Sequence, residues 1–163
     1  MNHGDAAASR RPQRAALPVD DSIFFKLVRV VNLTARPFSE SLGKASHLSL
    51  NEWRVLLVLA NHPQVAASEV AAFTGLDKMS VSRSLAALER RGRVVRKVDA
   101  ADRRRMLLRL SAAGERLYER IGVPAKLRER SLFRGIGAAD QELLARLLDR
   151  LIDNLVTADS TGS

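Results

Sequence analysis

The sequence predicts a mainly helical protein that carries one small β-hairpin. Apolar residues recur at helical spacing through most of the 163 residues, which indicates amphipathic helices. Residues 93–110 depart from that pattern, because there apolar side chains alternate with arginines as they do in strands. Aromatic residues form only 4% of the chain, so Leu, Val, Ile and Ala must build the core.

The first helix is expected to begin at Asp20 and Asp21, whose carboxylates can cap it. Its apolar stripe continues loosely towards Leu42, beyond a kink expected at Pro37. The stripe is defined by four side chains at helical spacing: Phe24, Leu27, Val28 and Val31. The chain should therefore open with a long amphipathic helix.

A capping box predicts the second helix. Ser49 and Glu52 are three positions apart, so each side chain can bond the backbone N–H of the other at a helix start. The helix should cover residues 50–61, and Pro63 should end it.

Two shorter helices joined by a tight turn should follow. The third covers residues 67–73 and stops at Gly75, although Ala66 at its N-cap position offers no side-chain acceptor. Asp77 caps the fourth helix, and Gly92, which tolerates a positive φ, ends it.

An extended, basic segment comes after the fourth helix. Two strands are expected at residues 93–98 (RVVRKV) and 103–110 (RRRMLLRL), on either side of a turn at 99–102 (DAAD). A helix, a short turn, a second helix and a hairpin in this order make a winged helix-turn-helix.

Two further helices complete the predicted fold. Ser111 caps the fifth, which should break near Gly122 and Pro124 and resume for some turns up to Phe133. The sixth opens near Asp140 and carries leucines in 4-3-4 spacing at Leu144, Leu148, Leu151 and Leu155. That spacing fits a core helix within one chain as well as a helix that pairs with a second copy.

The positive charge of the chain is concentrated in one segment. The whole chain has 27 basic and 18 acidic side chains, a formal charge of +9. Residues 78–109 contain eleven of the basic side chains and three acidic ones, which alone gives +8. A basic run is usually a solvated surface. Confinement to so short a segment instead favours binding to a polyanion.

The fourth helix has two chemically different faces. On a helical wheel Val81, Leu85 and Leu88 cluster on one side, which we expect to be buried. The other side, its flank and the first turn present Lys78, Met79, Ser80, Ser82 and Arg83. A recognition helix needs this division, because one face packs on the core while the other enters the major groove of DNA. Arg83 can make a bidentate contact to guanine, and the serines can bind bases or phosphates.

The hairpin turn adds a second basic element. It concentrates three arginines where loop residues would reach an adjacent minor groove: Arg103, Arg104 and Arg105. The helix by itself could be an ordinary solvated surface helix. The two basic elements in tandem favour a nucleic-acid interface.

The composition argues against several other classes of protein. The chain has no cysteine, which excludes disulfides, thiolate catalysis and cysteine-ligated zinc. Its longest purely apolar run, residues 55–60, is too short to cross a bilayer. The three histidines lack metal-ligand spacing, and the common nucleophile motifs are missing. We expect a cytoplasmic protein that is not an enzyme and uses no cofactor or metal.

From residue 48 to about 121 the chain resembles the MarR family of bacterial winged-helix transcription regulators. The matching motifs are LSLNEWRVL, EVAAFTGLDKMSVSRSLAALERRGRVVR and DAADRRRMLLRLSAAG. In the last of these the family typically shows an Asp-x-Arg wing followed by Leu-Ser/Thr-x-x-Gly. The order of the outer helices also fits, so the likeness in architecture spans residues 20–157.

The resemblance implies a homodimer that interlocks the first and last helices of each subunit and binds a near-palindromic operator in double-stranded DNA. It also implies that Asp102 orients Arg104, which enters the minor groove at the wing tip. The alternative for Asp102 is an exposed ion pair, worth about 0 to 1 kcal/mol.

Some family members respond to small phenolic or other anionic ligands in a cleft between the dimer helices and the winged domain. Three residues of this chain are near the corresponding place: His47, Trp53 and Arg54. We favour a core role for Trp53 and an ordinary loop position for His47. Oxidant sensing through cysteine, which other members use, cannot operate here.

The expected organisation assigns residues 1–19 to a disordered arm and 159–163 to a disordered tail. Residues 48–110 form the winged helix-turn-helix domain, and residues 20–47 and 111–158 form a helical dimerisation region. The expected function is that of a homodimeric transcriptional repressor whose affinity for DNA is lowered by a small-molecule effector. The alternative is a winged-helix module for protein assembly or RNA binding.

Overall fold

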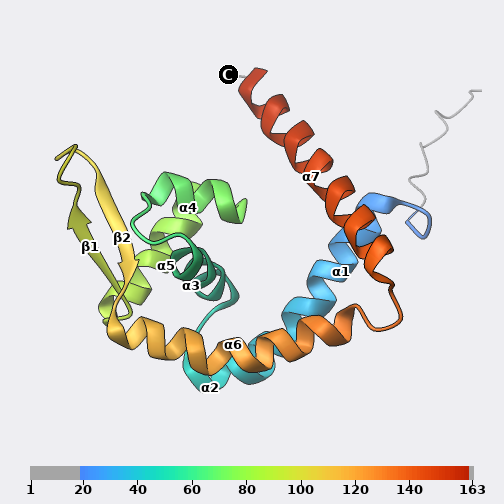
Figure 1. Cartoon of the computed structure of the whole chain (residues 1–163), viewed down its shortest axis with the longest axis horizontal. Helices are drawn as coiled ribbons and strands as arrows, with labels where there is room; N and C mark the ends of the chain where they lie inside the picture. Colours follow the sequence, from blue (N-terminus) through green and yellow to red (C-terminus); the bar gives the residue numbers. More distant parts are fainter. Residues whose placement is uncertain (1–18, 162–163) are drawn as a thin grey trace, which may run out of the picture. The chain divides into compact units, whose positions relative to one another are not determined.

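The computed structural model describes residues 19–161 and confirms the mainly helical class with one antiparallel hairpin (Figure 1). The chain divides into two compact units, residues 1–53 and 54–163. Apart from Val19, the predicted N-terminal arm lies outside the described residues.

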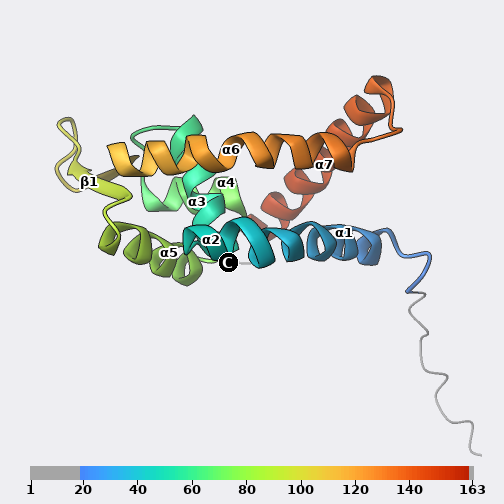
Figure 2. The same cartoon turned by 90° about the horizontal axis from the view of Figure 1, so that it is seen from below.

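The first unit contains one long helical run. It comprises α1 (Ile23–Pro37), a π-helix η1 (Phe38–Gly43) and α2 (Lys44–Ser46), which follow one another without interruption (Figure 2). The cap of α1 is Ser22, whose Oγ accepts from the N–H of Phe25 at 3.3 Å. The prediction that Asp20 and Asp21 cap this helix is wrong, because a cap must directly precede the first helical residue.

Pro37 changes the winding of this run without ending it. A proline ring crowds the carbonyl four residues earlier and supplies no N–H. The expected irregularity appears as the π-helical turn that begins at Phe38, directly after the proline. The run ends at His47, whose left-handed φ of 47° turns the chain back so that Leu48 N–H donates to Gly43 O at 2.8 Å.

The helix α3 (Leu50–Asn61) begins with the capping box that the sequence predicts. The N–H of Ser49 donates to Glu52 Oε2 at 2.8 Å, and the N–H of Glu52 donates to Ser49 Oγ at 3.2 Å. Trp53 on the next turn is buried and stacks on Phe38, with ring centroids 5.9 Å apart.

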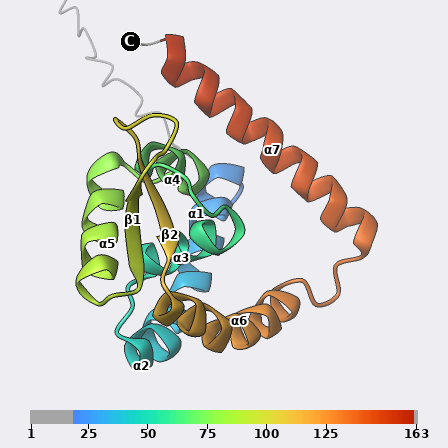
Figure 3. The ribbon, with the colours of Figure 1, turned by 60° about the vertical axis from the view of Figure 1, so that its left-hand side comes forward.

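The second unit holds the winged helix-turn-helix in the predicted order. The winged helix-turn-helix consists of α4 (Ala67–Thr74), α5 (Lys78–Arg90), β1 (Val94–Val98) and β2 (Met106–Leu110). Helix α5 contacts β1, while α4 contacts β2 (Figure 3). The strands pair antiparallel from Val94 opposite Leu110 to Val98 opposite Met106. The fully buried side chains of this unit include Val70, Val81, Leu85, Leu88 and Leu108.

Both glycine stops are confirmed, and the weak start of α4 is explained. Gly75 and Gly92 adopt positive φ values of 65° and 62°. Ala66 has no side-chain acceptor, but Glu69 Oε2 accepts from the N–H of Ala66 at 2.8 Å. The Glu half of a capping box therefore starts this helix.

The helix α6 (Ala112–Leu132) is continuous, so the break predicted near Gly122 and Pro124 is wrong. Pro124 has no N–H to donate to Arg120 O, and Arg120 is exposed, so water can solvate its carbonyl. The residues that follow, AKLRER, are good helix formers and carry the helix onward.

The start of α6 gives a physical reason for the Leu-Ser-x-x-Gly motif. Ser111 Oγ accepts from the N–H of Gly114 at 3.1 Å and donates to Gly92 O at 2.5 Å. A Cβ at Gly114 would lie 2.1 Å from Arg93 O, a distance that no real side chain tolerates. Serine caps the helix, and glycine lets it approach the start of the hairpin.

The last helix, α7 (Ala138–Thr161), begins two residues before Asp140 and passes the expected boundary at residue 158. Most of its large apolar residues are exposed, including Leu144, Leu147, Leu151, Ile152, Leu155 and Val156, while Leu148 is half-buried. Within residues 19–161 no helix combines the length and apolarity that crossing a bilayer would need.

Candidate nucleic-acid interface

Asp77 fixes the start of α5 with two hydrogen bonds from one residue. Ser80 donates its N–H to Asp77 Oδ1 at 2.8 Å and its hydroxyl to Oδ2 at 2.6 Å. These bonds, the hydroxyl bond foremost, hold the pKa of Asp77 below its ordinary value of 3.8, and the charge of Arg83 acts in the same direction. Ser80 was predicted to contact DNA, but its hydroxyl already donates a hydrogen bond to Asp77.

The exposed face of α5 agrees with the predicted division. Val81, Leu85 and Leu88 are buried, as expected. Ser84 is also buried, and its hydroxyl is satisfied by donating to Ser80 O at 2.8 Å. The side chains that α5 exposes near its N-terminus are Lys78, Met79, Ser82 and Arg83. Small, half-buried residues follow on this side, so the helix can approach a groove closely.

The turn of the hairpin is shaped by two aspartates. Asp99 Oδ1 accepts from the N–H of Ala101 at 2.9 Å, and Asp102 Oδ1 accepts from the N–H of Arg104 at 3.0 Å. Both are side-chain turns of the kind that aspartate favours. Asp102 therefore holds the main chain of Arg104, because it accepts from the N–H of that arginine.

The wing turn is longer than the sequence predicted. Asp99 N–H donates to Arg105 O at 3.0 Å and closes the turn, and the second strand starts at Met106. The prediction that residues 103–105 begin this strand is wrong, because the Asx turn at Asp102 bends the chain there. Arg103 and Arg104 are consequently exposed on the turn.

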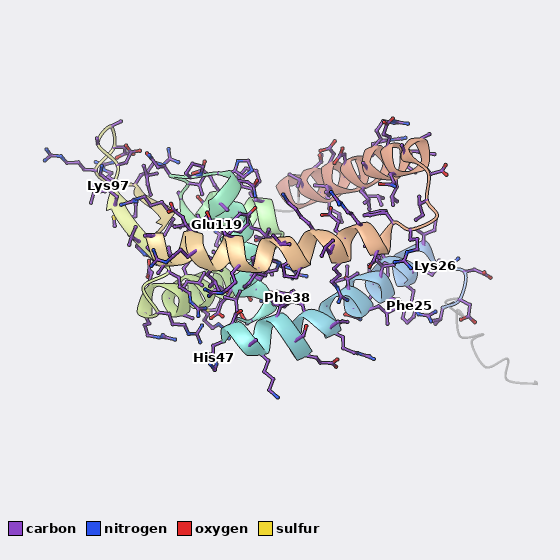
Figure 4. All side chains as sticks on the ribbon, turned by 60° about the horizontal axis from the view of Figure 1, so that its bottom comes forward. Phe25, Lys26, Phe38, His47, Lys97 and Glu119 are labelled. Carbon is purple, nitrogen blue, oxygen red and sulfur yellow. The ribbon has the colours of Figure 1, made fainter. Side chains whose placement is uncertain are left out.

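Two arginines of the basic segment form ion pairs. Arg96 on β1 pairs with Glu89 of α5. Arg105 Nη2 lies 2.7 Å from Glu69 Oε2 of α4. Lys97 lies exposed on the hairpin (Figure 4). Sequence reasoning gave no role to Glu69, whose partner is 36 residues away in the chain.

A third segment joins the hairpin. Val65 forms an antiparallel bridge with Leu108, whose N–H donates to Val65 O at 2.9 Å. The N–H of Gln64 donates to Leu108 O at 3.0 Å. The residues that lead into α4 are therefore bonded to β2.

The three residues considered for an effector differ in burial. His47 is exposed at the end of the first helical run (Figure 4). Trp53 is buried against Phe38, which agrees with the core role favoured from sequence. Arg54 is half-buried. Across the described part of the chain, no three His, Asp or Glu side chains gather as a set of metal ligands.

An exposed helix that follows a tight turn and is flanked by a basic wing defines the winged helix-turn-helix class of DNA-binding proteins. A model of the MarR family matches residues 47–105. Transcriptional regulator HosA from Escherichia coli O157:H7 is 34% identical over 110 residues, which are 65% of this chain and 78% of HosA. The chain belongs to the MarR family of transcriptional regulators.

Solved structures share this fold. CouR from Rhodococcus jostii RHA1, bound to p-coumaroyl-CoA, has a TM-score of 0.75 and 25% identity over 84% of this chain and 96% of CouR. NadR in complex with 4-hydroxyphenylacetate has a TM-score of 0.73 and 26% identity over 88% of this chain and 98% of NadR.

Proposed function

We propose that this MarR-family regulator is a homodimeric repressor that binds a near-palindromic operator in double-stranded DNA. The observation that carries the proposal is the pairing of an exposed polar face on α5 with a basic wing directly after it. Each subunit would place α5 in the major groove and its wing tip in the neighbouring minor groove.

The exposed residues of α5 suit different contacts. Arg83 can bind the O6 and N7 atoms of guanine, and Met79, which is 60% exposed, can contact the methyl group of thymine. Lys78 and Ser82 can bind phosphate or base atoms, whereas Ser80 can offer only the lone pairs of its oxygen. The wing would contribute Arg103 and Arg104, with Asp102 fixing the main chain of Arg104.

Exposed apolar surface supports the dimer. Phe24 on α1 is 75% exposed and Leu155 on α7 is 69% exposed, and both belong to stripes at helical spacing. Such stripes on long helices mark interaction surfaces. Residues 20–47 and 111–158, with α7 continuing to Thr161, would form the dimerisation region.

A small phenolic or anionic ligand is the proposed effector, since CouR was solved bound to p-coumaroyl-CoA and NadR in complex with 4-hydroxyphenylacetate. It would lower DNA affinity by binding better to a dimer geometry that cannot engage both half-sites. His47 and Arg54 are the candidate contacts, while Trp53 serves the core. We further propose a cytoplasmic regulator without enzymatic activity.

Binding to a duplex selected by the protein from random-sequence DNA tests the proposal. Affinity should fall roughly 10³- to 10⁵-fold between about 50 and 200 mM salt if about 6 to 10 phosphates are contacted. Double-stranded RNA and heparin should compete poorly with the selected duplex. A flat salt response, or equal binding of the RNA, would instead support a winged module for RNA or protein assembly.

A further inference from the structure

The three arginines at the wing tip have different surroundings. Arg105 is held by the carboxylate of Glu69 at 2.7 Å. Within the described residues, the recorded ion pairs include neither Arg103 nor Arg104, and both are exposed. Sequence alone assigned all three arginines to DNA.

The carboxylate of Glu69 is held by a second hydrogen bond besides its ion pair with Arg105. Its Oε2 accepts from the N–H of Ala66 at 2.8 Å, so the carboxylate is tied to the first turn of α4. The same oxygen accepts from Arg105 Nη2. The pair therefore joins the start of the helix-turn-helix to the end of the wing turn.

A second connection lies at the middle of β2. Gln64 and Val65 are bonded through their main chains to Leu108 of β2. That bridge fixes the middle of the strand, and the pair of Glu69 with Arg105 adds a contact closer to the tip. A wing held at two points along its length has a restricted angle relative to α4.

We propose that Glu69 is a positioning residue for DNA binding. It keeps Arg105 away from the phosphates and fixes the wing so that Arg103 and Arg104 are its groove-binding cations. This inference rests on the proposed function, because it assigns roles to the arginines of a wing that binds DNA.

The small energy of the pair between Glu69 and Arg105 decides which measurement can detect its loss. The two side chains are 48% and 44% exposed, and exposed pairs change an equilibrium by about fivefold at most. Overall stability is therefore a poor readout. The number of phosphates neutralised is a better one, because each cation that leaves or joins the interface changes the slope of log affinity against log salt by about 0.9.

The decisive experiment measures that slope on a selected duplex for full-length variants. Arg104→Ala should flatten the slope by about 0.9 per subunit. Arg105→Ala should leave the slope unchanged and weaken binding about two- to fivefold through a looser wing. Glu69→Gln keeps an acceptor for the N–H of Ala66 but releases Arg105, so it should steepen the slope. The double variant Glu69→Gln/Arg105→Ala should return to the wild-type slope.

Amide hydrogen exchange of the free protein supplies a readout without DNA. Exchange at residues 99–105 should accelerate in Arg105→Ala and in Glu69→Gln but not in Arg104→Ala. The proposal is overturned if Arg105→Ala flattens the slope as Arg104→Ala does, or if exchange in the wing is the same in all variants. Failure of the wild type to bind duplex DNA would overturn the proposed function instead, and the exchange measurement would still decide whether the pair anchors the wing.

Discussion

The winged region and the two outer helices, α1 and α7, differ in how far their apolar side chains are buried. Leu85 and Leu88 of α5 and Leu108 of β2 are at most 1% exposed. Phe24 of α1 and Leu155 of α7 are 75% and 69% exposed. One chain thus completes the core of its winged region, whereas its outer helices present apolar stripes to be covered by another surface.

The difference has energetic consequences. A helix in water depends mainly on packing of its apolar face. Helix α7 has 24 residues and a stripe of exposed leucines, so a partner surface would stabilise it. The stability of α7 should therefore depend on protein concentration, and that of the winged region should not.

The largest expected effect is a loss of core packing in the winged region. Leu85→Ala should lower the free energy of unfolding by about 2 to 5 kcal/mol, because it leaves a cavity where the side chain is completely buried. Urea denaturation should give the same loss at low and high protein concentration. A loss below about 1 kcal/mol would mean that this core is loosely packed.

The second effect concerns the outer helices. The double variant Leu151→Asp/Leu155→Asp should weaken dimerisation roughly 100-fold or more, because carboxylates would be buried without partners. Sedimentation equilibrium measures the dissociation constant. Arg146→Asp, on the opposite side of α7, is the matched control and should leave the dimer intact. An unchanged dissociation constant in the double variant would remove α7 from the interface.

A third effect separates base reading from phosphate binding within α5. Arg83→Ala should reduce discrimination between the selected duplex and one with a changed guanine by about 1 to 3 kcal/mol. Lys78→Ala should weaken binding to both duplexes alike and flatten the salt slope by about 0.9 per subunit. Equal losses on both duplexes from both variants would refute these roles.

The smallest effect comes from the cap of α5. Because hydrogen bonds from Ser80 lower the pKa of Asp77, its stabilising contribution is complete above about pH 4 and disappears as the pH falls through the lowered pKa. Asp77→Ala should lower Tm by roughly 2 to 4 °C at neutral pH and by less in acid. Asp77→Asn keeps a capping oxygen that does not titrate, so in thermal scans its loss of Tm at neutral pH should be smaller than that of Asp77→Ala, and the difference between the two variants should be the same at every pH. The same loss for both variants at every pH would contradict the role of the charged cap.

Short-range chemistry was predictable from the sequence. The box of Ser49 with Glu52, the cap at Asp77 and the stop at Gly92 each involve atoms a few residues apart, and all three are present. The irregularity expected at Pro37 is present, whereas the effect of Pro124 was overestimated, because the helix continues across one missing hydrogen bond.

Long-range pairing was not predictable. Glu69 and Arg105 are 36 residues apart, and no local pattern distinguishes Arg105 from the two arginines before it. The bridge between Val65 and Leu108 bonds the residues that lead into α4 to β2, beside the wing turn. The sequence therefore indicated the exposed polar face of α5 and the basic turn of the hairpin, but it did not reveal the ion pair of Glu69 with Arg105.

In the proposed complex, two copies of one winged surface engage adjacent turns of a DNA duplex. A hydroxyl-radical footprint on a duplex selected by the protein tests it most directly. We expect two symmetric protected patches with centres about 34 Å apart, each combining a major-groove segment with a flanking minor-groove segment. A single patch, or protection without symmetry, would contradict it.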